Sequence, residues 1–538
     1  MMFKKKKKSE ELYLNSFGKI KDDTFNFDLI EKYFRNKKQE NSFHVLSDKT
    51  CQDLDFDELF MFLDRTQSKV GQQYFYNKLR YIPSNQDHIN CSEELISAFR
   101  KDQEFRTNTQ KQLDRLSNSN SYYISSLFQD NHIQPPKWFF MIRLLSFTSV
   151  ISLLLLPFNG NLLFVLLSVF VINMGVHYWN KRNLYLNLKS IPALLKLSDT
   201  AKILFEEACF KELNPKLKLS INVVDKLRFR MKFFKLGGST VSELEAAIWM
   251  VMELVKTMFL LEPLLLFGIL RHLDTKRKEL EDLFIFVGEI DSLISVASLR
   301  EGADKYCLPV ITEEDTIIIA EELYHPLMIN AVPNSIRAYN KSILLTGSNM
   351  SGKTTFIRTI GINALTALTL NTCFGNSFSL PRLRIFSAIR ISDDLLNDRS
   401  YYFEEVLTIK EMLDESKSDA TNLFLLDEIF KGTNTVERIS AGKAVLSSMT
   451  QSNNFVFVST HDIELADLLQ EQYELYHFSE TVGNKTVDFD YKLKEGKLKN
   501  RNAIKILQLN DYPDCVINEA NEIANELDQV FANPIHSY

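Results

Sequence analysis

The chain has 538 residues, of which 45% are hydrophobic and 25% are charged, so it is a folded protein too long for one ordinary domain. Its formal net charge of −6 argues against coating nucleic acid over the whole surface, although it leaves room for a local basic patch. The six cysteines are scattered, with no CxxC and no Cys/His cluster, which indicates reduced cytosolic thiols and neither a metal site nor a disulfide framework.

The chain begins with a basic tail and a first helix, predicted over residues 1–45. Lys4 to Lys8 form a run of five lysines with no apolar segment behind it, so a secretory signal is not expected. The run is explained either as a solvated tail or as a contact with anionic lipid headgroups. Residues 46–137 follow as a helical core segment, because polar and apolar residues alternate at helical spacing over 51–115.

Residues 138–182 form the most apolar stretch of the chain. No Lys, Arg, Asp or Glu occurs at 144–180. This segment is long enough for two short membrane spans around the polar turn 157–161. Trp138 and Trp179 flank the stretch, and basic residues stand outside both ends. The pattern predicts a two-helix transmembrane hairpin with both ends cytosolic. A buried hairpin in a soluble helical domain is the alternative.

Residues 183–305 are predicted to be a second helical segment, helical at 184–212 and 243–302. Between these, "DKLRFRMKFF" at 225–234 alternates basic and apolar residues with a period of two, which predicts a strand. Its basic face would meet either solvent or phosphate groups. The apolar run at 246–270 is interrupted by charged residues and by proline, so helices of a soluble core are expected there, with a contact to lipid as the alternative.

Residues 306–530 show a different pattern, and 531–538 are a short tail. Short β-branched runs alternate with helices, which predicts an α/β domain with a parallel sheet. The runs are "TIIIAE", "SILLTG", "LRIFSAI", "NLFLLDE" and "NFVFVSTHD".

A phosphate-binding loop follows the second of these runs. "GSNMSGKT" fits G-x-x-x-x-G-K-[ST] between a predicted strand, Ser342 to Thr346, and a predicted helix, Thr355 to Leu370. Backbone N–H groups and the helix N-terminus would hold the phosphates of ATP, with Lys353 on the β- and γ-phosphates and Thr354 on Mg²⁺. The predicted nucleotide-binding residues are Gly347, Ser348, Asn349, Met350, Ser351, Gly352, Lys353, Thr354 and Thr355.

Three further elements would complete a hydrolytic site. Asp427 and Glu428 end an apolar strand, where Asp427 would hold Mg²⁺ and Glu428 would orient or deprotonate the attacking water. His461 ends another strand and is expected to sense the γ-phosphate. The loop after the acids is either an ordinary turn or a loop that reaches the nucleotide of another subunit; its residues are Gly432, Thr433, Asn434 and Thr435.

In this order the motifs resemble the MutS family of DNA mismatch-repair ATPases. "TGSNMSGKTT" is similar to the family's TGPNMGGKST, with Ser348 in place of proline, and "DEIFKGTNT" is similar to DEIGRGTST. "SDDLLNDRSYYFEEV" and "STH" match two more motifs, and "YHFSE" resembles the family's segment near the adenine, which implies a contact from His477. The resemblance covers roughly 50–85 and 280–525.

The resemblance implies a MutS-type P-loop ATPase domain, of the ABC-type class, preceded by a helical core and lever domain. It also implies a homodimer through the ATPase domain, in which each site is completed by the partner's loop, and a possible role on DNA. The 538 residues contain no counterpart of the family's mismatch-reading or connector domains, and the apolar hairpin stands where the family has its lever helices and DNA clamp.

Three functions therefore remain open. The first is a membrane-anchored, dimeric, Mg²⁺-dependent ATPase related to mismatch-repair proteins, with lipid contacts through 138–182 and with DNA as a possible partner. The second is a membrane-associated ATPase scaffold with no nucleic-acid role. The third is a soluble homologue with 144–179 in its core. The first places the ATPase domain and both termini on the cytosolic side of the cytoplasmic membrane, and the third places the protein in the cytoplasm.

Overall fold

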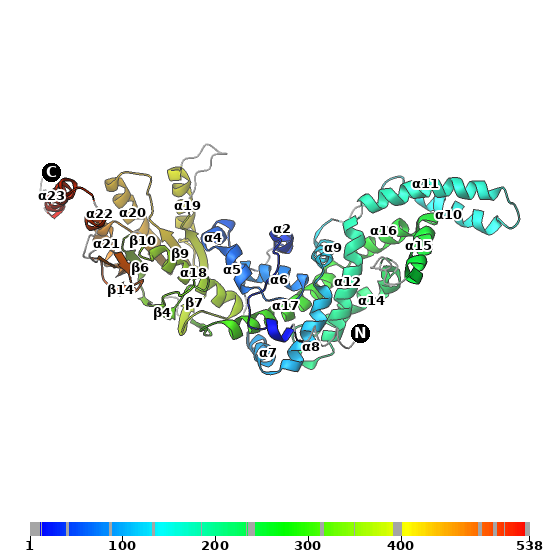
Figure 1. Ribbon diagram of the computed structural model, residues 1–538, viewed down its shortest axis with the longest axis horizontal. Coiled ribbons are helices and arrows are strands. Elements are labelled where there is room, and N and C mark those ends of the chain that lie inside the picture. Colours follow the sequence, from blue (N-terminus) through cyan, green and yellow to red (C-terminus); the bar gives the residue numbers. More distant parts are fainter. Residues whose placement is uncertain are drawn as a thin grey trace. The chain divides into compact units, whose positions relative to one another are not determined.

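The computed structural model divides the chain into two units, which are described separately (Figure 1). Unit 1 comprises residues 1–41, 60–80 and 85–302, and unit 2 comprises residues 42–59, 81–84 and 303–538. The structure describes residues 11, 13–38, 42–84, 89–131, 135–183, 185–232, 234, 243–312, 317–348, 350–390, 401–482, 487–498, 503–510 and 512–532.

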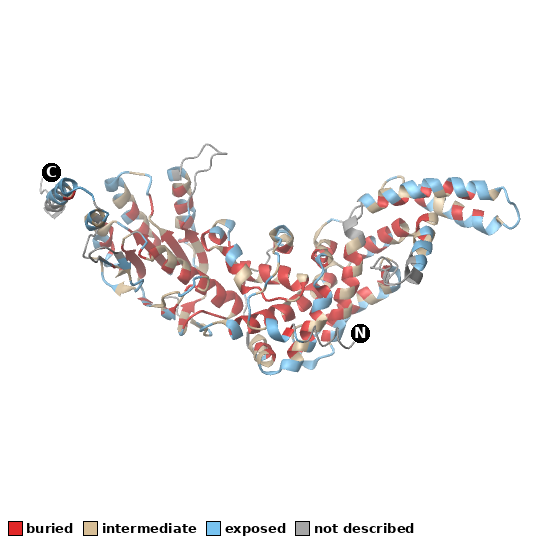
Figure 2. Ribbon diagram, viewed as in Figure 1, coloured by how far each residue is buried: buried red, intermediate tan, exposed pale blue. Residues whose placement is uncertain are grey.

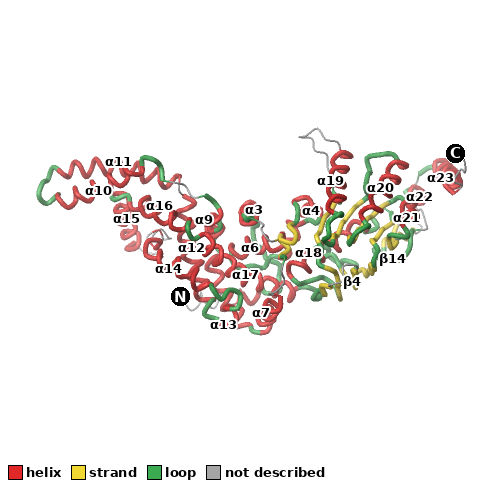
Figure 3. The backbone as a smooth tube through the Cα atoms, turned by 180° about the vertical axis from the view of Figure 1, so that it is seen from behind, coloured by secondary structure: helices red, strands yellow, loops and turns green. Residues whose placement is uncertain are grey.

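The regular elements of unit 1 among the described residues are helices, joined by loops (Figure 3). A further helix, α5 (Phe56–Leu63), begins in unit 2 and ends in unit 1. The helices of unit 1 are α2 (Phe27–Ile30), α3 (Lys32–Asn36), α6 (Lys69–Arg80), α7 (Ile89–Lys101), α8 (Gln103–Leu113), α9 (Ser126–Gln129), α10 (Phe139–Leu155), α11 (Leu162–Asn183), α12 (Tyr185–Leu204), α13 (Ala208–Lys211), α14 (Leu217–Lys232), α15 (Glu243–Met258), α16 (Leu261–Asp274), α17 (Arg277–Gly302) and the 3₁₀ turns η1 (Asp114–Leu116) and η2 (Ser119–Ile124).

The core of unit 1 forms around α17, whose second half is buried on nearly all sides (Figure 2). α6, α7, α12 and α14 pack against it. α6 approaches α17 closely at Gly71, where an added Cβ would lie 2.1 Å from the Asp291 carboxylate. No side chain fits in that space, so glycine is required for this packing.

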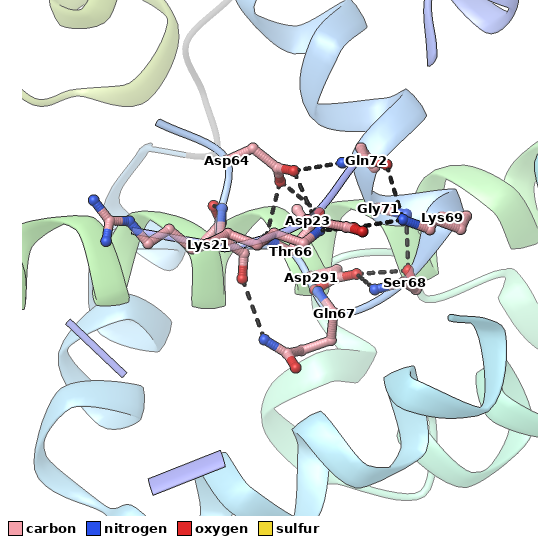
Figure 4. A network of polar contacts seen from close by, with 12 residues as sticks. Lys21, Asp23, Asp64, Thr66, Gln67, Ser68, Lys69, Gly71, Gln72 and Asp291 are labelled. Atoms are coloured by element: carbon pink, nitrogen blue, oxygen red, sulfur yellow. Dashed lines mark hydrogen bonds and ion pairs between the residues drawn. The ribbon is translucent and has the colours of Figure 1, made fainter. Parts of the chain in front are cut away.

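The Asp291 carboxylate caps the N-terminus of α6 from the neighbouring helix (Figure 4). It accepts hydrogen bonds from the backbone N–H groups of Gln67 and Ser68, both at 2.8 Å, and from the Ser68 hydroxyl at 2.5 Å. Burial raises the pKa of Asp291 to about 6, against the opposing effect of these three donors. The cap satisfies N–H groups that a helix start leaves without partners.

The predicted strand at 225–234 is wrong, because residues 225–232 lie in α14 and Phe233 lies outside the described residues. Val224, Leu227 and Met231 are buried and stand three or four residues apart, which is the spacing of one helix face. The alternating basic residues favoured a strand, but the buried apolar residues have helical spacing, and a helix forms. Arg228 also forms ion pairs with Asp199 and Asp225, so part of the expected basic face is neutralised.

The apolar stretch forms a helical hairpin, in which α10 packs against α11. Among the described residues, one helix is long and apolar enough to cross a membrane: Leu162–Arg182, which contains an 18-residue window with a mean hydropathy of 1.9 and 17% of its residues buried. Phe139–Leu155 is a shorter apolar helix. The structure thus shows the predicted pair of helices, and only the second meets the length and composition of a span.

Unit 2 contains a six-stranded sheet in the order β14-β11-β6-β10-β9-β8 and a four-stranded sheet in the order β3-β7-β4-β5. All neighbours in the six-stranded sheet are parallel except β14, so the predicted parallel α/β core is confirmed. All five predicted strand runs form strands; the one at 316–321 belongs to the smaller sheet as β4.

The strands and helices of unit 2 have the following bounds. The strands are β1 (Ser42–Val45), β2 (Tyr81–Pro83), β3 (Val310–Thr312), β4 (Ile317–Leu323), β5 (Asn334–Tyr339), β6 (Ser342–Thr346), β7 (Ser377–Pro381), β8 (Arg384–Ala388), β9 (Asn422–Asp427), β10 (Asn454–Thr460), β11 (Tyr473–His477), β12 (Glu480–Val482), β13 (Val487–Phe489) and β14 (Lys494–Glu495). The helices are α4 (Asp48–Asp53), α18 (Lys353–Leu370), α19 (Tyr401–Glu415), α20 (Thr435–Met449), α21 (Ile463–Leu469), α22 (Ala503–Leu509) and α23 (Asp514–Ala532).

An early segment of the chain belongs to unit 2. Residues 42–59 were expected in the tail and helical core, but they pack with the sheet unit, as residues 81–84 do. The buried Asp53 carboxylate at the end of α4 accepts hydrogen bonds from the Ser387 hydroxyl at 2.6 Å and from the backbone N–H groups of Ile389 and Arg390 at 2.9 and 2.7 Å. It thus caps the chain where β8 ends.

Candidate nucleotide-binding site

Three parallel strands bring the sequence motifs to one edge of the sheet. Thr346 at the end of β6 lies opposite Thr460 of β10, and Asp427 at the end of β9 lies opposite Ser459 of β10. The segments that leave β6, β9 and β10 carry the phosphate-loop motif, the two acids and the histidine. The carboxyl ends of parallel strands are the usual place for a ligand in open α/β sheets.

The loop between β6 and α18 is folded around the Lys353 ammonium group. Lys353 donates hydrogen bonds to the backbone carbonyls of Gly347 and Ser348, both at 2.8 Å. The backbone at Gly347 has φ +150°, and an added Cβ would lie 2.8 Å from the carbonyl oxygen of Phe478, so glycine is needed there. Asn349 lies outside the described residues.

The remaining loop residues lead into α18. Gly352 is the N-cap, Lys353 is the first helical residue, and Thr355 lies in the first turn. Met350 is 83% exposed, whereas the Ser351 hydroxyl is buried with no hydrogen-bond partner among the described residues. A buried hydroxyl of this kind, beside free N–H groups of a helix N-terminus, fits a bound phosphate oxygen.

The Thr354 hydroxyl and the Asp427 carboxylate lie 2.9 Å apart. The Ser459 hydroxyl donates a short hydrogen bond to the other oxygen of the same carboxylate, which fixes its orientation. A hydroxyl and a carboxylate are hard oxygen ligands of the kind that Mg²⁺ prefers. The predicted metal residues therefore come together, and their chemistry fits a magnesium ion.

Glu428 sits on a strained turn directly after β9. Its φ is +52°, a conformation that few residues other than glycine adopt. Its carboxylate pairs with Lys431 at 2.9 Å and with His461 at a shorter distance. Burial opposes ionisation of Glu428, but the hydrogen bonds from His461 and Lys431 outweigh burial and lower its pKa to about 2. At neutral pH the group is an ionised acceptor that can orient a water molecule.

Lys353 is the buried cation of the site. Burial lowers the pKa of the Lys353 ammonium group, and the nearby carboxylates of Glu428 and Asp427 partly offset this effect. A buried cation beside two acids is the arrangement of charges that a polyphosphate and its metal ion require.

The loop from Gly432 to Thr435 starts α20 and is largely exposed. Asn434 is the N-cap, and its side chain accepts a hydrogen bond from the Glu437 N–H at 3.0 Å. Thr433 donates to the Glu437 carboxylate at 2.8 Å. The loop is therefore an ordered helix start with outward-facing polar groups. This geometry agrees with both alternatives from the sequence: an ordinary turn, and a loop that reaches the nucleotide of another subunit.

His477 ends β11 beside the phosphate loop, in register with Thr346. Its Nδ1 lies 2.9 Å from the carbonyl oxygen of Gly496, which fixes the ring. Three residues further on, the Glu480 carboxylate accepts a hydrogen bond from the Ser348 hydroxyl at 2.7 Å. The segment that carries the predicted adenine contact is thus tied to the phosphate loop.

Several residues of the site were not predicted from the sequence. Glu405 on α19 is 1% exposed and accepts a hydrogen bond from the Phe430 backbone N–H, which holds the segment after Glu428. Burial raises the pKa of Glu405. The other missed residues are Lys431, Ser459 and Glu480, each of which stands within a quoted motif or beside a predicted site residue. Residues 391–400, which include much of the "SDDL" motif, lie outside the described residues.

Comparison with known proteins places the similarity in unit 2. Residues 343–528 match the family model for MutS domain V. A DNA mismatch repair protein MutS from Aquifex pyrophilus is 30% identical over 254 residues, which is 45% of this chain and 29% of that protein. The proteins of the same name from Natronomonas pharaonis and Staphylococcus haemolyticus are 28% identical over 247 and 270 residues, or 44% and 48% of this chain.

The aligned parts cover only 28–30% of the length of these relatives. The matched segment contains β6, the phosphate loop, both acids and His461, which are the elements that form the site. Over this segment the chain is similar to MutS proteins, and residues 343–528 are a MutS domain V-like segment.

Proposed function

We propose that unit 2 binds ATP with Mg²⁺ and hydrolyses it. The observation that carries this proposal is the convergence of Lys353, Thr354, Asp427 and Glu428 at one edge of a parallel sheet. The resident metal would supply charge neutralisation at the phosphates. Lys353 would add a second positive charge there, and Glu428, with His461 and Lys431 on its carboxylate, would orient the attacking water.

The ATPase proposal is tested with Lys353→Ala. Removing the ammonium group leaves the phosphates without their fixed cation, so ATP binding or turnover should be lost. Lys443→Ala, an exposed lysine of α20, is the matched control and should behave as wild type. Fluorescent-nucleotide binding and phosphate release measure the two steps. Unchanged affinity and hydrolysis in Lys353→Ala would contradict the proposal.

We further propose that two copies of the chain pair through unit 2, with the loop Gly432–Thr435 of each copy completing the other's site. The support is the exposure of this loop, only four residues after Glu428, and the similarity to MutS domain V. Oligomers of identical chains commonly form such two-fold interfaces.

We propose that α10 and α11 anchor the chain in the cytoplasmic membrane, with unit 2 and both termini in the cytosol. The support is an inside-out distribution of side chains. The buried polar residues of the two helices are Ser149, Ser152, Asn173, His177 and Asn180. Large exposed apolar residues include Phe140, Leu144, Phe147, Leu154, Phe164 and Val171. Water favours the opposite arrangement, whereas lipid favours this one.

The length of α11 and the residues at the base of the hairpin agree with this anchor. α11 has 22 residues, which corresponds to about 33 Å and is enough to cross the hydrocarbon thickness of about 30 Å, whereas the 17 residues of α10 correspond to about 26 Å. Trp138 and Trp179 stack edge-to-face at its base, with centroids 4.9 Å apart, as aromatic residues do at the membrane interface.

The anchor is tested by topology mapping in intact cells. A cysteine at Gly160, in the turn, should react with an impermeant thiol reagent, and one at Lys181 should not, because the uncharged turn crosses and the base stays inside. The exposed native thiols Cys209 and Cys515 are first replaced by serine. Labelling at neither position, with recovery of the protein in the soluble fraction, would favour a buried hairpin in a soluble homologue.

A role on DNA is a further proposal, carried only by the names of the relatives. Salt-dependent binding of mismatched and matched duplexes by the hairpin-deleted protein tests it, because phosphate contacts weaken steeply with salt. Absence of binding at low salt would leave a membrane-associated ATPase scaffold as the function.

A further inference from the structure

α15 and α16 form a second helical hairpin that packs against α11, at the base of the first. The two helices are joined by a short turn in which Leu260 has φ +50°. α15 runs antiparallel to α11, because Lys181 pairs with Glu253 near the middle of α15 while Asn173 contacts its end.

The backbone of this turn is capped by side chains of the first hairpin. Asn173 of α11 donates a hydrogen bond to the Met258 carbonyl at 2.7 Å, and Ser146 of α10 donates to the Phe259 carbonyl at 2.8 Å. Carbonyls at a helix end exposed to water need no such partners. Carbonyls of non-helical backbone within a membrane need such partners, because lipid cannot donate a hydrogen bond.

The charged groups nearest the turn, on Glu253, Lys256 and Glu262, point inward. Lys256 and Glu262 are 4% and 5% exposed, and their charged groups lie 3.4 Å apart. Lys256 also pairs with Glu253 at 3.5 Å, and His177 of α11 lies 3.3 Å from Glu253. Glu253 also pairs with the partly exposed Lys181, so each of the two acids has a lysine partner.

The outer face of α15 is apolar. Ile248, Met250, Val251 and Leu254 are 50–68% exposed and lie on one side of the helix. A helix that buries its lysine and exposes isoleucine, methionine, valine and leucine is inside-out in the same sense as α10 and α11. Ionisable residues in membrane proteins pair with each other and face the interior in this way.

We propose that α15 and α16 are a re-entrant hairpin that dips into the cytosolic leaflet beside α10 and α11, with the exposed face of α15 on lipid. The inference rests on the proposed insertion of the first hairpin. Asn173 stands six residues before Trp179, so the capped turn lies about 9 Å above the aromatic pair. That depth places the turn in the acyl region, and by the same rise Leu254 lies about 3 Å above the aromatic pair, at the edge of the acyl region, and Ile248 about 6 Å below it, among the headgroups.

The proposal is tested with spin labels on the full chain in vesicles of phosphatidylcholine and phosphatidylglycerol. Single cysteines at Leu254 and Val251 are labelled in a background in which Cys91, Cys209, Cys307 and Cys515, the cysteines that are not buried, are replaced by serine. Phe164 of α11 serves as the lipid reference, and Leu468 of unit 2, which is apolar and 56% exposed, serves as the water reference. Accessibility to oxygen reports lipid, and accessibility to a water-soluble nickel complex reports solvent.

We expect Leu254 to resemble Phe164, with several-fold greater accessibility to oxygen than to nickel, and Val251 to lie between the two references. Lipid-like values at Phe164 with water-like values at Leu254 would overturn the re-entrant hairpin and leave the anchor intact. Water-like values at both would refute the anchor itself. Broadening of Leu254 by a second labelled chain, without oxygen accessibility, would assign the face to a dimer contact and also overturn the proposal.

Discussion

At the scale of single residues, the Glu428 carboxylate combines a strained backbone with two cationic partners. A carboxylate with a pKa of about 2 is a weak base, so we assign it the orientation of water more than the removal of a proton. Its identity as an acid could be anticipated from the strand end in the sequence. Its pairing with His461 could not, because that contact depends on where β10 ends beside β9.

Glu428→Gln should bind ATP and hydrolyse it about 10²–10⁴-fold more slowly, because the group that orients water loses its charge while Thr354 and Asp427 keep their positions. Single-turnover hydrolysis and nucleotide affinity, measured on the same preparation, separate the two effects. Full turnover in this variant would move the role to another group, of which His461 is the nearest.

At the scale of elements, β1 is joined to β8 by a histidine that must stay neutral. The His44 Nε2 lies 2.9 Å from the Ile385 carbonyl oxygen, and its ring contacts Phe386. Burial lowers the pKa of His44 to about 4. The unfolded chain, with a pKa near 6.5, binds a proton first as the pH falls, so stability is full above pH 6.5 and is lost toward pH 4.

His44→Gln should flatten this acid-side loss of stability, because glutamine keeps an N–H donor and does not titrate. The shift in pKa corresponds to a change on the order of 3 kcal/mol between pH 6.5 and 4. Urea unfolding of both proteins at a series of pH values measures it. His272→Gln, an exposed histidine of α16, is the control; an unchanged pH slope in His44→Gln would contradict the assignment.

The elements also show why the sequence predicted some parts and missed others. Parallel strands such as β9 and β10 are continuous apolar runs ended by polar residues, and this signal is local, so they were found. α14 was missed because its basic residues alternate while its buried ones follow helical spacing. The pairing of Glu405 with the Phe430 N–H joins residues 25 apart and could not be read from either motif alone.

At the scale of the whole molecule, the proposed sharing of sites would make hydrolysis a property of the pair of chains. Lys353→Ala keeps its loop but loses its own site, and the double variant Thr433→Ala/Thr435→Ala keeps its phosphate loop and the Asn434 cap. Each should be inactive alone. Mixing them should restore part of the wild-type rate, because the first chain's loop completes the second chain's site. Phosphate release after mixing measures this, and no recovery, despite a confirmed mixed dimer, would contradict sharing.

The alternation of segments between the two units limits how unit 2 can be transferred between genes. Each unit consists of three segments in turn, so the chain passes between them five times. A fragment that begins at residue 303 would lack Asp53, leaving the Ile389 and Arg390 N–H groups and the Ser387 hydroxyl without their acceptor. A gene segment that starts at residue 303 would therefore transfer unit 2 without residues 42–59 and 81–84, and a contiguous segment that carries all of unit 2 must also carry residues 60–80 and 85–302 of the helical unit.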